Sequence, residues 1–156
     1  RKGAYVADIS TKDIADVFEI RASLEGLAAG LAAERITDEE LEIMERCLVI
    51  KAEAIATADF DKLVDIDTKF HEAIYKASRN ERLWAIVNNL REQIQRLRMT
   101  SLSVPGRMYQ SLKEHRAIVE AIQSRDVSLA RQLAQDHIEN AENVMMESIK
   151  RDGLPR

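Results

Sequence analysis

An aspartate and a histidine are the residues of this sequence that are most clearly suited to chemistry. Asp67 and His71 lie four residues apart in a segment with helical periodicity, and side chains at that spacing share one helical face, with Cβ atoms about 6 Å apart. We expect this face to be buried, because Leu63, Phe70 and Ile74 continue the same apolar stripe.

The other two histidines of the chain, His115 and His137, each lie on a separate later helix, again among apolar positions. A lone His on an apolar face is usually an ordinary core residue. If an inward stripe takes up a third of a helix, however, all three would fall inward by chance in only about 1 case in 27. Asp is rarely buried unless it is paired or bound to a metal. Because imidazoles and a carboxylate suit zinc, nickel, iron or manganese, the pattern predicts a divalent metal site formed by Asp67, His71, His115 and His137.

The spacing argues against two common metal chemistries. Tyr75 stands where a His-Glu-x-x-His peptidase motif starting at His71 would place its second His, and the Glu-x-x-His pairs of di-iron bundles are missing. A five- or six-coordinate ion with four protein ligands would have positions left for water or the oxygens of a small acid. Arg21 is a charged residue inside an apolar stripe. Its guanidinium group either binds the carboxylate of such an acid with two hydrogen bonds or pairs with Glu25. Both interpretations stay open.

Composition favours one all-α domain of normal globular character. The 156 residues are 46% apolar and 32% charged, and no Gly or Pro occurs between Leu31 and Val104. The net charge of −4 argues against a nucleic-acid-binding face on this chain alone. A single Cys47 fits a reducing compartment, and the longest apolar run, residues 27–33, is too short to span a bilayer. We expect a cytoplasmic protein.

Helix start and stop signals divide the chain into six expected helices with short connections, which makes an antiparallel bundle the natural architecture. The fourth of these is expected to run without a break through Leu83 and Leu97. The six begin near Ser10, Thr37, Asp59, Asn80, Gly106 and Asp126.

The chain also contains a set of short strings in a fixed order: Phe18-Glu-Ile-Arg-Ala-Ser-Leu-Glu25, Asp67-x-x-Phe-His71, Ser78-x-Asn80-x-x-Leu83, Pro105-Gly-Arg107, Glu114-His115, Ala121-Ile-x-x-Arg-Asp126 and His137-Ile138. Together they resemble the C-terminal effector-binding domain, or FCD domain, of GntR-type transcription regulators of the FadR subfamily. The resemblance covers the chain from Asp13 to about Val144. Each string is weak by itself, but the ordered set is specific.

The resemblance implies a bundle of six to seven helices that forms a homodimer and senses a small metabolite, often a carboxylate or a sugar acid. In the metal-binding branch of the family an Asp and three His hold the ion, and they correspond here to Asp67, His71, His115 and His137. Zinc is the expected metal, with nickel, manganese or iron as alternatives. Arg21, and secondarily Arg98, are implied as effector-binding residues.

The resemblance also implies a domain organisation. Residues 1–9 are similar to the closing wing strand and linker of an N-terminal winged helix-turn-helix domain, and residues 10–152 are expected to be the helical effector-binding and dimerisation domain. DNA would be contacted only through the missing N-terminal domain, and no membrane partner is expected.

The sequence therefore predicts the ligand-sensing domain of a bacterial transcription regulator and not an enzyme. Two alternatives stay open. One is a metal-dependent hydrolase, because a metal with open positions can activate water, although the sequence offers no unassigned inward carboxylate or His as a general base. The other is a metal-free helical dimerisation module whose histidines are structural.

Overall fold

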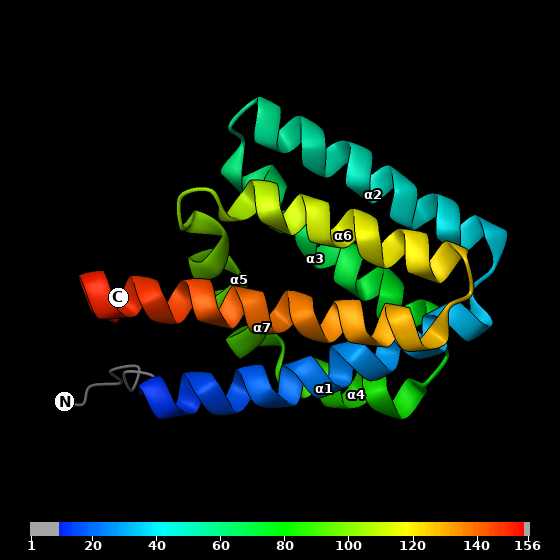
Figure 1. Ribbon diagram of the computed structural model, residues 1–156, viewed down its shortest axis with the longest axis horizontal. Helices are drawn as coiled ribbons and strands as arrows, with labels where there is room; N and C mark the ends of the chain where they lie inside the picture. Colours follow the sequence, from blue (N-terminus) through cyan, green and yellow to red (C-terminus); the bar gives the residue numbers. More distant parts are fainter. Residues whose placement is uncertain (1–9, 155–156) are drawn as a thin grey trace.

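The computed structural model describes residues 10–154, and this part of the chain forms seven α-helices and no strand (Figure 1). The predicted all-α bundle is confirmed. The expectation for residues 1–9 lies outside the described residues. Within the described part, no helix combines the length and the apolar character needed to cross a membrane. The helices are α1 (Thr11–Arg35), α2 (Asp38–Ala56), α3 (Phe60–Ala77), α4 (Glu81–Asn89), α5 (Arg91–Ser103), α6 (Arg107–Gln123) and α7 (Val127–Asp152).

Side-chain caps set the start of five helices. In each, an oxygen of the capping side chain accepts a hydrogen bond from the backbone N–H three residues later, which satisfies one of the unpaired donors of the first turn. Helix α6 begins instead after Gly106, whose φ of 84° lies in the left-handed region that glycine adopts without steric cost. The five capping residues are Ser10, Thr37, Asp59, Asn80 and Asp126.

The predicted fourth helix is divided into α4 and α5, so the prediction of one continuous helix was wrong. Leu90 separates them with φ −101° and ψ 5°, and α5 begins without a side-chain cap. Asn88 and Asn89 precede the break, and Asn disfavours the helix interior because its side chain competes for backbone hydrogen bonds. The division lets α4 contact α1 and α3, whereas α5 also reaches α6 and α7.

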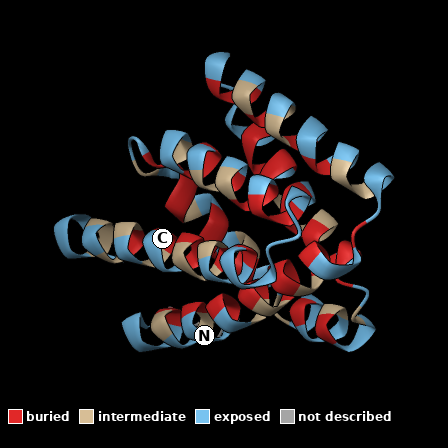
Figure 2. Ribbon diagram, turned by 45° about the vertical axis from the view of Figure 1, so that its right-hand side comes forward, coloured by how far each residue is buried: buried red, intermediate tan, exposed pale blue. Residues whose placement is uncertain are grey.

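Helices α1 and α7 run antiparallel along most of their length and form the most extensive helix pair (Figure 1). Helix α6 packs on α7 and α2, and α3 packs on α1 and α2. The start of α1 and the end of α7 lie at the same end of the bundle. This arrangement directs the buried faces of α3, α6 and α7, the three helices that carry histidines, toward the same interior region (Figure 2).

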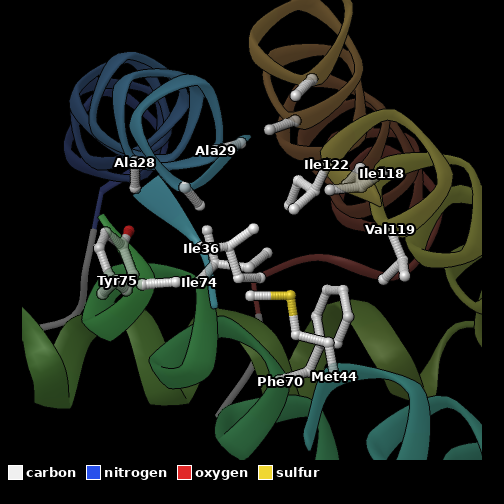
Figure 3. Close-up of a cluster of buried hydrophobic side chains, with 14 of the residues drawn as sticks. Ala28, Ala29, Ile36, Met44, Phe70, Ile74, Tyr75, Ile118, Val119 and Ile122 are labelled. Atoms are coloured by element: carbon white, nitrogen blue, oxygen red, sulfur yellow. The ribbon is translucent and has the colours of Figure 1, made fainter. Parts of the chain in front are cut away.

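The main apolar core lies beside that region and fixes the helix positions (Figure 3). Ala28 and Ala29 of α1 are fully buried, and their small side chains allow the helices to approach closely. Phe70 of α3 is 1% exposed, and its ring stacks on the imidazole of His115 with centroids 4.0 Å apart. The core therefore holds the α3 backbone at His71 and the His115 ring at the same time.

Candidate metal centre

The structure brings the three histidines into one buried cluster. One ring nitrogen each from His71, His115 and His137 lies within 4.8 Å of the other two, and the Nε2 atoms of His115 and His137 are 3.0 Å apart. Asp67 lies beside them, with Oδ2 3.5 Å from His71 Nε2 and Oδ1 3.8 Å from His115 Nε2. The four residues that the sequence singles out are therefore neighbours, and their role as metal ligands stays a prediction.

Two carboxylates orient the imidazoles of His71 and His137 from the outside of the cluster. Glu25 Oε1 accepts a hydrogen bond from His71 Nδ1 at 2.7 Å, and Glu114 Oε1 accepts one from His137 Nδ1 at 2.6 Å. Because a carboxylate only accepts, each bond places the imidazole proton on Nδ1. The Nε2 atom then carries an unprotonated lone pair on the side of the cluster, which is the arrangement that metal-ligating histidines normally have.

A buried lysine completes the cluster, and the sequence analysis missed it. Lys51 of α2 is 1% exposed. Its Nζ donates hydrogen bonds to Asp67 Oδ1 at 2.8 Å and to Ser111 Oγ at 2.6 Å, and it lies 3.1 Å from His115 Nδ1. Asp67 is therefore already paired with a cation inside the protein.

The two arginines proposed as effector contacts lie at the cluster, each with a protein partner. Arg21 Nε donates to Glu25 Oε2 at 3.2 Å, which is the pairing that the sequence left as one of two interpretations. Arg98 Nε lies 3.0 Å from Asp67 Oδ2, without the geometry of a hydrogen bond. Arg98 Nη1 donates to Thr68 Oγ1 at 2.9 Å. Arg98 therefore borders the predicted ligand Asp67 directly, whereas Arg21 is linked to His71 through Glu25.

A third arginine, Arg107, holds the outer side of His137. It is 2% exposed and binds Glu114 with both terminal nitrogens, at 3.1 and 2.7 Å. It also donates to the backbone carbonyl of His137 at 3.3 Å. Arg107 and Glu114 occur in the family strings, but no role was predicted for them; in the structure they set the orientation of a predicted ligand.

The pKa values of Asp67 and Glu114 favour the charged carboxylate, and those of His115 and His137 favour the neutral imidazole. Burial acts to raise the pKa of Asp67, but Lys51 and the histidines lower it well below its usual value. Burial, and then Lys51, lower the pKa of His115 well below its usual value. Burial lowers the pKa of His137 to about 4 against the opposing effect of Glu114, and His137 and Arg107 lower that of Glu114 to about 2 despite burial. These are the protonation states that metal binding requires.

Buried polar atoms without a hydrogen-bond partner gather at one small cleft. Among residues 10–154 they are His71 Nε2, Tyr75 Oη and Arg98 Nε, and all three residues line a cleft walled by α1, α3, α4 and α5. A second cleft is lined by Asp67, Arg21 and, like the first, Arg98. Unpaired buried polar groups are costly and rare in native proteins, and a bound ion or small ligand at this cleft could satisfy these atoms.

The donor set fits a divalent ion. Among the residues that the structure describes, His71 Nε2 has no hydrogen-bond partner; it lies 3.5 Å from Asp67 Oδ2 and carries no proton when Nδ1 donates to Glu25. The ring nitrogens of His115 and His137 and the ionised Asp67 supply the remaining donors, all buried. Imidazole nitrogen and carboxylate oxygen are the ligands preferred by zinc and its neighbours in the first transition row.

Comparison with known proteins agrees with the resemblance seen in the sequence. A family model described as the FCD domain matches residues 16–140. The chain is 29% identical over 133 residues to the uncharacterized HTH-type transcriptional regulator YdhC of Bacillus subtilis, and the match covers 85% of this chain and 59% of that protein. It is 25% identical over 139 residues to the HTH-type transcriptional repressor RspR of Escherichia coli, covering 89% and 61%.

A solved structure, Streptococcus agalactiae GntR, matches the fold with a TM-score of 0.74 and 26% identity, covering 91% of this chain and 63% of that one. The chain spans about three fifths of the length of the two curated relatives. Both relatives are named as HTH-type transcriptional regulators.

Proposed function

We propose a function for this chain from one premise: it belongs to the FCD domain family. Its matched relatives are transcriptional regulators, and we propose that this chain is the effector-binding domain of a bacterial regulator of the GntR type. In this proposal the domain also forms the homodimer, and a separate N-terminal domain contacts DNA. The hydrolase alternative has no support among these relatives.

The metal part of the proposal depends on one observation: three imidazoles and the Asp67 carboxylate from three helices converge in a buried cluster. We propose that Asp67, His71, His115 and His137 hold one divalent ion, zinc first, with nickel, manganese or iron as alternatives. The ion would supply coordination positions for the oxygens of a small ligand. Because the four ligands belong to α3, α6 and α7, binding would also join these helices and stabilise the fold.

The charge around the cluster favours an anionic effector. Four buried cations face three carboxylates, which leaves one formal positive charge before any ion binds; the cations are Arg21, Lys51, Arg98 and Arg107, and the carboxylates are Glu25, Asp67 and Glu114. A divalent ion would add two more positive charges. A small carboxylate metabolite would balance this charge, with Arg98 and Arg21 at the clefts as its guanidinium partners.

The small size of the cleft beside His71 implies that an effector would have to move the helices around it. Its volume of about 30 Å³ holds a few water molecules at most, so a metabolite has to move the walls. Two walls are α4 and α5, which meet at the non-helical Leu90. We propose that the effector favours an arrangement with α4 and α5 displaced, because a ligand shifts an equilibrium only through different affinities for its two states.

Thermal unfolding of the metal-loaded protein with a panel of small carboxylic acids tests the proposal. We expect at least one acid to raise the melting temperature of the wild type. Arg98→Gln should lose that response while its metal content stays unchanged, and Arg96→Gln, which alters an exposed arginine two residues earlier on α5, should respond as the wild type does. No response to any acid, or a full response in Arg98→Gln, would contradict the effector site.

Two further measurements separate the alternatives. Turnover of ester or phosphate substrates by the metal-loaded protein would favour the hydrolase. A melting curve that is indifferent to both chelator and added metal would favour the metal-free dimerisation module.

A further inference from the structure

The Lys51 ammonium borders the cluster and contacts two of its predicted ligands, Asp67 and His115. Its Nζ lies 2.8 Å from Asp67 Oδ1, 2.6 Å from Ser111 Oγ and 3.1 Å from His115 Nδ1. An ammonium has three N–H donors and no acceptor, so three acceptors satisfy it fully. A fully buried Lys is rare without such pairing, and at 1% exposure water does not replace these contacts.

These contacts decide where the protons of two histidines lie. Because Lys51 only donates, His115 Nδ1 accepts, and the proton of the neutral His115 ring is on Nε2. His115 Nε2 then donates across 3.0 Å to Nε2 of His137, whose own proton is on Nδ1 and bonds to Glu114. A chain of hydrogen bonds, each donating in the same direction, thus runs from the Lys51 ammonium through His115 and His137 to the Glu114 carboxylate.

This arrangement conflicts with metal binding at His115. The nitrogen of His115 that faces His137 and Asp67 is Nε2, and a ligating nitrogen carries no proton. With Nε2 free, the neutral ring must carry its proton on Nδ1, where it would point at the N–H donors of Lys51. The ammonium therefore has to leave Nδ1 before His115 can ligate, and the charge of Lys51 opposes a second cation beside Asp67.

We propose that Lys51 is a tethered cation that takes the place of the metal in the metal-free protein and competes with it for Asp67 and His115. Lys51 keeps the cluster assembled without an ion and lowers the affinity for one, so that the site exchanges its metal instead of holding it permanently. The inference rests on the proposed metal site and adds an internal competitor to it.

Metal affinity in Lys51→Met measures this competition, because Met keeps an unbranched side chain only one atom shorter than that of Lys and removes its charge. Titration calorimetry with zinc alone, with helix content checked by circular dichroism, should give Lys51→Met a Kd at least about tenfold lower than the wild type, equivalent to about 1.4 kcal/mol. Lys51→Met without metal should melt at a lower temperature than the wild type, because Asp67 loses its partner, and should gain more from added zinc. Lys69→Met, which removes an exposed lysine of α3, should match the wild type.

The outcomes separate this inference from the function it rests on. If the wild type binds zinc and Lys51→Met binds it equally or more weakly, the competition is refuted and the metal site stands. If neither binds zinc, both proposals fail. If Lys51→Met binds zinc and the wild type does not, the competition is supported, and Lys51 occupies the site so strongly that zinc cannot displace it.

A second measurement does not depend on the folding of the variant. Nitrogen chemical shifts of His115 in the metal-free wild type report which ring nitrogen carries the proton. We expect the proton on Nε2, and its transfer to Nδ1 when zinc is added. A proton on Nδ1 in the metal-free protein would overturn the proposal.

Discussion

Replacing Glu114 with Gln tests whether the buried network around His137 stabilises the protein as the contacts indicate. Glu114 accepts hydrogen bonds from His137 Nδ1 at 2.6 Å and from Arg107 at 2.7 and 3.1 Å. Gln has the same shape but only one accepting oxygen and no charge. The variant therefore leaves the buried guanidinium of Arg107 without its counter-ion.

The size of the effect follows from the pKa of Glu114, which lies at about 2 against an ordinary value of 4.5, as His137 and Arg107 outweigh the effect of burial. The difference corresponds to about 3 kcal/mol, at about 1.4 kcal/mol for each pKa unit. A lowered acid pKa stabilises the fold above the unfolded value and loses that contribution as the pH falls toward the folded value. Glu114→Gln should therefore lower the free energy of unfolding by about 3 kcal/mol at neutral pH, with a difference from the wild type that narrows below about pH 4.5.

Urea unfolding of the metal-free protein, followed by circular dichroism and Trp84 fluorescence, measures this difference. Glu120→Gln, on the exposed side of the same helix, is the matched control and should unfold as the wild type does. In the presence of zinc, Glu114→Gln should also bind the metal about 10- to 100-fold more weakly, as is usual when a carboxylate behind a ligating histidine is removed. Stability within about 0.5 kcal/mol of the wild type, typical of an ordinary surface substitution, would refute the reasoning.

Three further predictions concern the same fold. The free energy of unfolding of the metal-free protein should fall by at least about 3 kcal/mol as the pH drops from 6.5 to about 4, because burial lowers the pKa of His137 to about 4 and only the unfolded chain binds that proton in this window. The lowered pKa of His115 adds to this fall. Urea melts across this range, in the presence of a chelator, will show it, and a flat profile would contradict it. Phe70→Ala should cost about 3–5 kcal/mol in the same assay, since Phe70 is 1% exposed in the core; a loss under about 1 kcal/mol would show a core that closes around the cavity. Gly30→Ala should stabilise α1 by about 0.5–1 kcal/mol, because its added Cβ makes ordinary contacts at 3.5 Å. Gly26→Ala should give no such gain, because its Cβ would lie 2.6 Å from Gln135 Cγ. Equal shifts of the melting temperature in the two variants would refute this difference.

The convergence of the histidines was predictable from the sequence because it depends on helical periodicity. Asp67 and His71 share the apolar stripe of α3, and His115 and His137 lie on the apolar stripes of two other helices. In a bundle of this length all such stripes meet in one interior. The break at Leu90 was not predictable in the same way, since an apolar pattern continues through it from α4 into α5.

The charged groups around the histidines were harder to foresee, because a charged side chain is normally assigned to the surface. Lys51 continues the buried stripe of Met44 and Cys47 at helical spacing, which was the available signal. Its partners Asp67 and Ser111 are 16 and 60 residues away, and only the fold shows that they meet.

The same limit applies to Arg107 and Glu114. They lie seven residues apart on α6, two turns along one face, and their spacing alone suggests no more than a surface pair. Their contact with His137 of α7 gives them a role at the cluster.

Metal content of the tag-free protein, measured by mass spectrometry for the wild type and His71→Ala after equilibration with zinc, tests the central claim most directly. The wild type should retain about one ion per chain, as expected for a single site built from four ligands, and melt at a lower temperature once a chelator removes it. His71→Ala should lose both the ion and its stabilising effect, because a site assembled only in the fold contributes its binding energy to folding. Retention of the ion by His71→Ala, or no ion in the wild type, would contradict the assignment of this cluster as a metal centre.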